Sequence, residues 1–193
     1  MTIDAAFTHF PSLTTKRLYL RQIQPGDVEA LFAIKSDTKV TEPYGQEPHR
    51  SIEETQALIQ RLQALYERRE ALFWCITLKG EDTVIGSCTF FQFDADYLYA
   101  ETGYELHRAY WRRGITAEVV SAVLTYGFTE LGLHRIEANV DASNTPSENL
   151  LLKLGFTYEG NLRQRYYFRG RFEDQHCFGL LRDEWMISER STN

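Results

Sequence analysis

Apolar and polar residues alternate along several short stretches of the chain, which is the pattern of half-buried β-strands. Glycine-containing turns separate two pairs of these stretches, at 79–82 and around Gly170. The strands predicted in this way cover residues 18–23, 73–78, 84–93, 97–106, 135–140, 158–168 and 176–181.

Helices are predicted between these strands. The clearest one covers 116–131, where apolar residues recur at the spacing of one helical face. A second covers 27–35 with Asp27 as its N-cap, and a third covers 51–69, where Ser51 and Glu54 have capping-box spacing. A short helix at 147–154 is expected to end at Gly155. The order of elements predicts a mixed α/β domain with a mostly antiparallel sheet.

Composition narrows the class of protein. With 193 residues and no Pro/Ser-rich linker or repeat, residues 1–193 are expected to form a single domain. A net charge of −6 argues against nucleic acid as a partner. Cys75, Cys88 and Cys177 are too scattered for a zinc site, so no metal is expected. There is no membrane-length apolar run and no signal-peptide core, which indicates a cytoplasmic protein without a membrane partner.

The segment 110–117, which reads YWRRGITA, joins a predicted strand to the predicted helix at 116–131. A glycine turn at a helix start presents several backbone N–H groups at the positive end of the helix dipole, which suits a diphosphate. Arg108, Arg112 and Arg113 add local positive charge. An ordinary solvated turn is the alternative. No Gly-Lys-Ser/Thr follows Gly114, which argues against a Walker-type nucleotide site.

Several further motifs follow in a fixed order. They are ETGYEL at 101–106, WRRGITA at 111–117, YGF at 126–128, LGLHRI at 131–136, NTPS at 144–147, LGF at 154–156 and LLRDEW at 180–185. In this order the chain resembles the GCN5-related N-acetyltransferase (GNAT) superfamily, and within it the ribosomal-protein N-terminal acetyltransferase (RimJ/RimL) type. The resemblance covers nearly the whole chain.

The resemblance implies a GNAT fold: a central, mostly antiparallel twisted sheet of about seven strands with flanking helices, and a splayed strand pair that holds acetyl-CoA. It implies that acetyl-CoA is bound by residues at the end of one strand, in the turn and at a later helix start. These are Leu106, His107, Arg112, Arg113, Gly114, Ile115, Thr116, Ala117 and Asn144. Two positions depart from the family, because Arg112 replaces a frequent glycine and Thr116 replaces a small residue. An arginine at positive φ would be strained.

Catalytic roles also follow from the resemblance. The backbone N–H near Leu106 would hold the oxyanion, and Asn144 would bind the pantetheine amides. Ser147 would act as the general acid for the departing thiolate, with Tyr158 and Tyr166 as alternatives in that role. Asn144 and Ser147 are also common residues at helix starts and could serve only as caps.

The general base is less well defined. Glu101 and Glu105 share one face of a predicted strand by parity, so both carboxylates could face the same cleft. A solvent-facing row of charge is the alternative. Asp174 could orient the amine or a water, and a chain of waters could replace a dedicated base.

The acceptor cleft is expected between the 41–50 loop and the 164–174 hairpin, with Glu42, Tyr44, Tyr166 and Asp174 as binding residues. The resemblance makes the N-terminal amine of a ribosomal or similar protein the expected acceptor, attacked without an acyl-enzyme intermediate. A polyamine or aminoglycoside is the rival acceptor. Two rivals of other classes are a non-catalytic CoA-binding sensory module and an RNA-associated protein that uses the arginine-rich hairpin. A monomer or a homodimer is expected.

Overall fold

A computed structural model of the chain describes residues 3–192. The strands are β1 (Leu13–Thr14), β2 (Leu18–Gln22), β3 (Ala71–Leu78), β4 (Val84–Asp94), β5 (Tyr99–Leu106), β6 (Arg135–Asp141), β7 (Thr157–Phe168) and β8 (Arg171–Leu181). The α-helices are α1 (Ile3–Ala6), α2 (Val28–Lys35), α3 (Thr38–Thr41), α4 (Ile52–Glu67), α5 (Ile115–Thr129), α6 (Thr145–Lys153) and α7 (Arg182–Thr192). Three 3₁₀ turns are η1 (Pro25–Asp27), η2 (Glu42–Tyr44) and η3 (Arg108–Tyr110).

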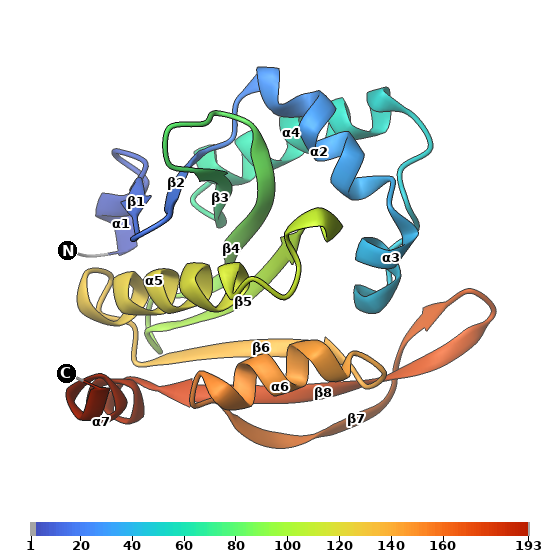
Figure 1. Cartoon of the computed structure of the whole chain (residues 1–193). Coiled ribbons are helices and arrows are strands. Elements are labelled where there is room, and N and C mark those ends of the chain that lie inside the picture. Colours follow the sequence, from blue (N-terminus) through green and yellow to red (C-terminus); the bar gives the residue numbers. More distant parts are fainter. Residues whose placement is uncertain (1–2, 193) are drawn as a thin grey trace.

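The strands described form one eight-stranded sheet in the order β1-β2-β3-β4-β5-β6-β8-β7. All neighbouring pairs are antiparallel except β5 and β6, which run parallel. This parallel pair is the junction between two halves of the sheet, and Figure 1 shows β6, β8 and β7 diverging from β4 and β5. The predicted mixed α/β class and mostly antiparallel sheet are therefore confirmed. The additional strand, β1, has only two residues, which is too short for a visible alternation.

Helices cover both faces of the sheet (Figure 1). Consecutive residues of β3 point to opposite faces of the sheet and pack against different helices. Trp74 belongs to the core cluster that includes α5, and Cys75 belongs to the cluster that includes α2 and α4. Gly127 of α5 allows a close approach, because a Cβ there would lie 2.9 Å from Cζ of Phe90. The apolar face predicted for 116–131 is thus buried against the sheet.

Neither of the two predicted N-cap residues, Asp27 and Ser51, forms a capping hydrogen bond to its helix. Asp27 directly precedes α2 but does not cap it, because its carboxylate accepts from the N–H of Gln24 and pairs with Arg21. Ser51 makes no capping hydrogen bond to the backbone of α4. Glu54 nevertheless accepts from a backbone N–H just before the helix, as a capping-box glutamate does. The helix α7 was not predicted at all, whereas the expected helix end at Gly155 is confirmed by its φ of +91°.

Candidate functional site

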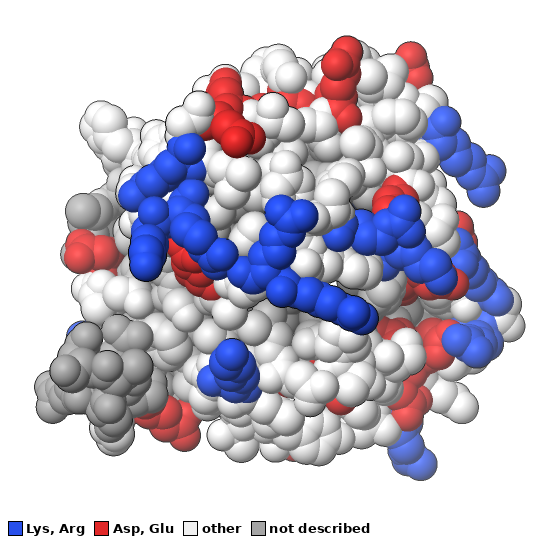
Figure 2. Space-filling view, in the orientation of Figure 1, with Lys and Arg blue, Asp and Glu red and all other residues white. Residues whose placement is uncertain are grey.

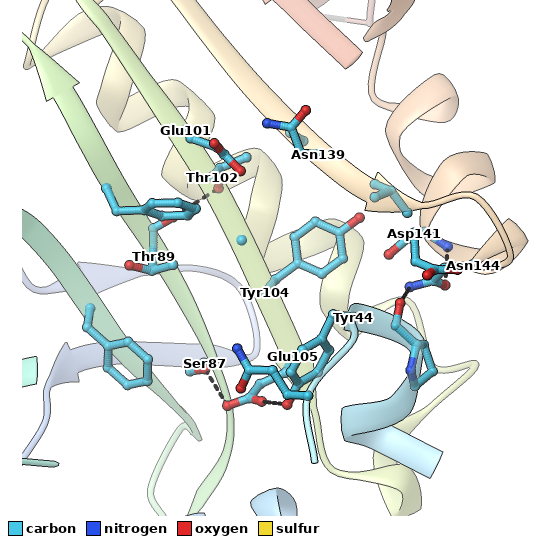
Figure 3. A pocket seen from close by; sticks show the side chains of 18 of the residues that line it. Tyr44, Ser87, Thr89, Glu101, Thr102, Tyr104, Glu105, Asn139, Asp141 and Asn144 are labelled. Carbon is cyan, nitrogen blue, oxygen red and sulfur yellow. Dashed lines mark hydrogen bonds between the residues drawn. The ribbon is translucent and has the colours of Figure 1, made fainter. Parts of the chain in front are cut away.

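The two halves of the sheet separate within the β5–β6 pair. The pairing covers only Tyr99–Glu101 against Arg135–Glu137, and the strands diverge beyond it. A cavity of about 270 Å³ opens at this gap, between β4, β5, β6, η2 and the start of α6 (Figure 3). The strand β5 therefore has unpaired backbone groups on one edge, where a ligand can bind.

The N–H of Leu106 points into this gap. The N–H of His107 donates to the carbonyl of Ile85 in β4 at 2.8 Å, and neighbouring strand residues turn their N–H groups to opposite edges. The carbonyl of Leu106 accepts from Nε1 of Trp111 at 2.7 Å. Leu106 thus offers a backbone donor, turned away from β4, at the point where the family resemblance places an oxyanion donor.

The turn before α5 has the expected form. Gly114 is the N-cap residue of α5 with a φ of 70° and makes no side-chain cap. The N–H groups of the first helical turn, at Ile115, Thr116 and Ala117, have no acceptor within the helix. Arg112 has a φ of 60°, so the strained arginine anticipated from the sequence is present.

Basic side chains gather around this turn. Figure 2 shows a row of Lys and Arg across the face that carries α5. Arg17 joins the group by donating to the carbonyl of Arg113 at 2.9 Å and to Glu118 at 2.6 Å. Arg17 was not identified from the sequence, because it lies nearly 100 residues before the turn. The exposed Arg112 and Arg113 add to this positive field, which attracts an anion to the free backbone amides.

Most of the residues predicted for catalysis line the cavity. Glu101, Glu105, Tyr44, Asn144 and Ser147 are all on its wall, although they come from β5, η2 and the start of α6. The carboxylates of Glu101 and Glu105 do not form a solvent-facing row, since these residues are only 9% and 8% exposed. The prediction from strand parity that both carboxylates face the same cleft therefore agrees with the structure.

Both carboxylate oxygens of Glu105 accept hydrogen bonds from neighbouring side chains. Its Oε2 accepts from Nζ of Lys35 at 2.7 Å and from the hydroxyl of Tyr44 at 2.7 Å, and its Oε1 accepts from Ser87 at 2.9 Å. Burial raises the pKa of Glu105, but the ammonium of Lys35 and these hydrogen bonds outweigh burial and leave it below its ordinary value. Glu105 is a stable, charge-balanced carboxylate.

Glu101 has the opposite environment. Burial raises its pKa above the ordinary value; a hydrogen bond from Asn139 acts against that rise and the charge of Glu137 adds to it. Glu137 lies directly across on β6, but Arg135 pairs with it at 2.7 Å. None of the ion pairs within the described residues includes Glu101. A buried carboxylate with a raised pKa is suited to accept a proton near neutral pH.

The start of α6 brings two more groups to the cavity. Asn144 is the N-cap of α6, where its Oδ1 accepts from the N–H of Ser147 at 3.2 Å and its Nδ2 donates to the carbonyl of Pro43 at 3.0 Å. The hydroxyl of Tyr104, on the same cavity wall, is buried and has no hydrogen-bond partner among the described residues. Burial raises the pKa of Tyr104 to about 12, while Ser147 lowers it. Tyr104 was missed because strand parity places it on the face opposite Glu105.

The β7–β8 hairpin closes the side of the site where the acceptor cleft was expected. Arg169 at its tip pairs with Glu42 at 2.6 Å and with Glu47 at 2.9 Å, and the hydroxyl of Tyr166 donates to Asp141. Tyr166 lines a second cavity of about 620 Å³, which shares Tyr44, Glu101, Asn139 and Asp141 with the first.

Asp174, predicted to bind the acceptor, and Tyr158, an alternative general acid, lie apart from both cavities. Asp174 accepts from the N–H of Gln164 at 2.7 Å and from Asn161 at 2.8 Å, at an irregularity of β7. Tyr158 packs edge-on against His176 and Phe178. Tyr166 is therefore the better placed of the two tyrosines that were alternatives to Ser147.

The described residues, 3–192, contain no group of three or more His, Cys, Asp or Glu side chains arranged to hold a metal ion. No helix among them has the length and apolar character needed to cross a membrane.

Comparisons with known proteins agree with this geometry. A family model described as an acetyltransferase (GNAT) domain matches residues 17–157. The uncharacterized N-acetyltransferase YoaA of Bacillus subtilis is 42% identical over 90% of this chain and 98% of its own length. A 26% identical relative, covering 90% of this chain and 92% of its own, is the [ribosomal protein uS5]-alanine N-acetyltransferase of Escherichia coli.

Solved structures share the fold at low sequence identity. Spermidine N-acetyltransferase from Vibrio cholerae, in complex with CoA and spermine, superposes with a TM-score of 0.79 at 20% identity. The match covers 89% of this chain and 99% of that one.

Proposed function

This chain belongs to the GNAT family of acetyltransferases, and we propose that it transfers an acetyl group to the N-terminal amine of a ribosomal or similar protein. As a member of this family it is an N-acetyltransferase that uses acetyl-CoA. The observation that carries the proposal is the splayed β5–β6 gap, with an unpaired N–H at Leu106 and a buried, unpaired carboxylate at Glu101 on its wall.

The cofactor side of the gap fits a diphosphate and a thioester. The free amides of Ile115, Thr116 and Ala117 would hold the diphosphate, with support from Arg112, Arg113 and Arg17. Acetyl-CoA supplies an activated acetyl group on a sulfur leaving group. The N–H of Leu106 stabilises the oxygen anion that develops on the acetyl carbonyl, and removing such a donor typically costs about 10²–10³ in rate.

Proton transfer is assigned to two side chains of the cavity. Glu101 accepts the proton that the acceptor nitrogen loses as it forms the new C–N bond, because its raised pKa makes it a better base than Glu105. Ser147 donates to the departing sulfur as the C–S bond breaks. Tyr104 lines the same cavity wall as Ser147.

The ribosomal acceptor is supported by a relative at 26% identity and by the chemistry of an α-amine. An α-amine has a pKa of about 8, against about 10.4 for a lysine side chain, so a single carboxylate can deprotonate it near neutral pH. The second cavity, beyond Tyr44, gives a peptide chain room to continue away from the reacting nitrogen.

A polyamine is the second candidate acceptor. Four carboxylates line the two joined cavities, at Glu101, Glu105, Glu137 and Asp141. Lys35 neutralises Glu105 and Arg135 pairs with Glu137, so Glu101 and Asp141 remain to attract an acceptor with more than one positive charge. Vibrio cholerae spermidine N-acetyltransferase, with the same fold, is a precedent for such acceptors.

The test is CoA thiol release from acetyl-CoA, with product mass, for a panel of amines. The panel holds a hexapeptide with a free N-terminal alanine, the same peptide N-acetylated but with an internal lysine, spermidine and kanamycin. Acetylation of the free-alanine peptide alone supports the proposal, and acetylation of spermidine alone supports the second candidate. No product from any amine, alongside tight CoA binding, would contradict both.

The catalytic assignment has its own control pair. Ser147→Ala should lower kcat by about 10²-fold, the usual contribution of a general acid. Ser121→Ala removes the same hydroxyl from α5, outside both cavities, and should leave kcat unchanged. Equal rates for the two variants would remove Ser147 from the mechanism.

A further inference from the structure

Glu105 is the centre of a buried polar network that joins four elements. Its partners are Tyr44 of η2 and Ser87 of β4, which Figure 3 shows, and Lys35 at the end of α2. The side chains of Lys35 and Glu105 are only 11% and 5% exposed, and the ammonium of Lys35 lies 5.5 Å from the ring centre of Tyr44. A charge pair this deeply buried is retained at a desolvation cost, so its geometry is held tightly.

The 3₁₀ turn η2 crosses the mouth of the gap and is fixed on both sides. On the β5 side, Tyr44 donates to Glu105. On the β6 side, the carbonyl of Pro43 accepts from Asn144 at the start of α6. Next to it, Gly45 lies under the ring of Tyr166, where a Cβ would be 2.5 Å from Cε2. The turn therefore spans the two diverging halves of the sheet on the acceptor side.

The network does not exchange protons near neutral pH. The pKa of Glu105 lies below its ordinary value despite burial, because Lys35 and three hydrogen bonds favour the carboxylate. Burial, followed by the charge of Glu105 and its hydrogen bond, raises the pKa of Tyr44 far above its ordinary value. Tyr44 therefore remains a donor and Glu105 an acceptor throughout the working range.

We propose that Lys35 and Glu105 are positioning residues: they hold Tyr44, and through it η2, beside the N–H of Leu106, and so set where the acceptor amine stands. Leu106 directly follows Glu105 in β5, so the oxyanion donor and the anchor of the acceptor wall belong to one rigid strand. Glu105 acts through Tyr44 and takes no proton from the acceptor. The inference rests on the proposed acceptor cleft but does not depend on which amine enters it.

The sharpest variant is Tyr44→Phe, which removes one hydroxyl and leaves the Lys35–Glu105 pair intact. Its matched control is Tyr66→Phe, because the hydroxyl of Tyr66 donates to the carbonyl of Ala6, away from both cavities. KM is measured with spermidine and with the free-alanine hexapeptide. Tyr44→Phe should raise KM about tenfold, as expected for losing one hydrogen bond to a charged group, and change kcat less than threefold. The Kd of CoA should stay unchanged.

Glu105→Gln adds a second test. It should raise KM to a similar extent and leave the acidic limb of the kcat/KM pH profile in place. The double variant Tyr44→Phe/Glu105→Gln should be no worse than about tenfold, because both changes break the same contact. A kcat loss of about 10² with disappearance of the acidic limb would make Glu105 the base and overturn the proposal.

Hydrogen exchange keeps the proposal testable without turnover. Backbone amides of residues 42–47 should exchange faster in Tyr44→Phe than in the wild-type protein or in Tyr66→Phe. Unchanged exchange at 42–47, or an unchanged KM in Tyr44→Phe, overturns the proposal even if the enzyme is active. A different outcome separates the two proposals. If the amides of 42–47 exchange faster in Tyr44→Phe but the wild-type protein acetylates no amine, the proposed function is contradicted and the positioning role is still supported.

Discussion

Gly86 of β4 lies opposite Leu106 of β5, at a point where the sheet has no room for a side chain. A Cβ at Gly86 would lie 2.5 Å from the backbone oxygen of Glu105, 2.9 Å from Cδ1 of Leu106 and 3.1 Å from its Cα. A carbon–oxygen contact needs about 3.3 Å, so Gly86→Ala must push this end of β5 away by roughly 0.8 Å. The displaced segment carries the N–H that we assign to the oxyanion.

The expected loss follows from that displacement. A misplacement of about 1 Å costs on the order of 10² in rate, so kcat/KM should fall about 100-fold. Overpacking should cost about 1–3 kcal/mol of unfolding free energy, and Tm should fall by about 2–4 °C per kcal/mol. The assay is CoA release with the best amine of the panel, together with a thermal melt.

Gly26→Ala is the matched control, because a Cβ at Gly26 meets nothing within 4 Å. It should leave both kcat/KM and Tm close to the wild-type values. If Gly86→Ala lowers Tm but keeps wild-type kcat/KM, the placement of Leu106 does not control the rate, and the assignment of its N–H as the oxyanion donor is refuted.

Three further outcomes are expected. Arg112→Gly should raise Tm by about 2 °C, because it relieves a left-handed residue worth about 1–2 kcal/mol against a smaller entropy cost of glycine. The same variant should weaken CoA binding, because the guanidinium that supports the diphosphate is lost. A lower Tm would mean that the side chain of Arg112 stabilises the turn. Burial raises the pKa of Glu101, so the native state binds its proton more tightly than the unfolded chain and ionisation weakens folding. Glu101→Gln should therefore raise Tm at pH 8 and lose that advantage below pH 4.5, the ordinary value, as melts at both pH values would show. Asp27→Ala leaves the guanidinium of Arg21, whose side chain is 8% exposed, without its buried partner. The free energy of unfolding, measured by denaturant titration, should fall by about 3 kcal/mol. A loss below about 1 kcal/mol would mean that Asp82 alone is a sufficient partner for Arg21.

Most of the local structure follows from residues that are neighbours along the chain. Alternation located the major strands, and the 3.6-residue period located α5, because both patterns are set by neighbouring residues along the chain. The order of motifs also indicated the GNAT family, which the match over residues 17–157 confirms. The turn at Gly114 was expected because a strand-to-helix turn has local backbone requirements. The family resemblance, which places a frequent glycine at position 112, only raised the condition under which Arg112 would be strained, and the structure meets that condition.

Ion pairing between side chains, by contrast, depends on how distant elements pack together. Glu101 and Glu105 have the same parity on one strand, yet Lys35, 70 residues before Glu105, neutralises one of them and leaves the other unpaired. Tyr44 likewise gains its role from Glu105, 61 residues away. Charge balance and pKa depend on distances between elements, and these distances are set by packing of the whole sheet, which no short window of sequence contains.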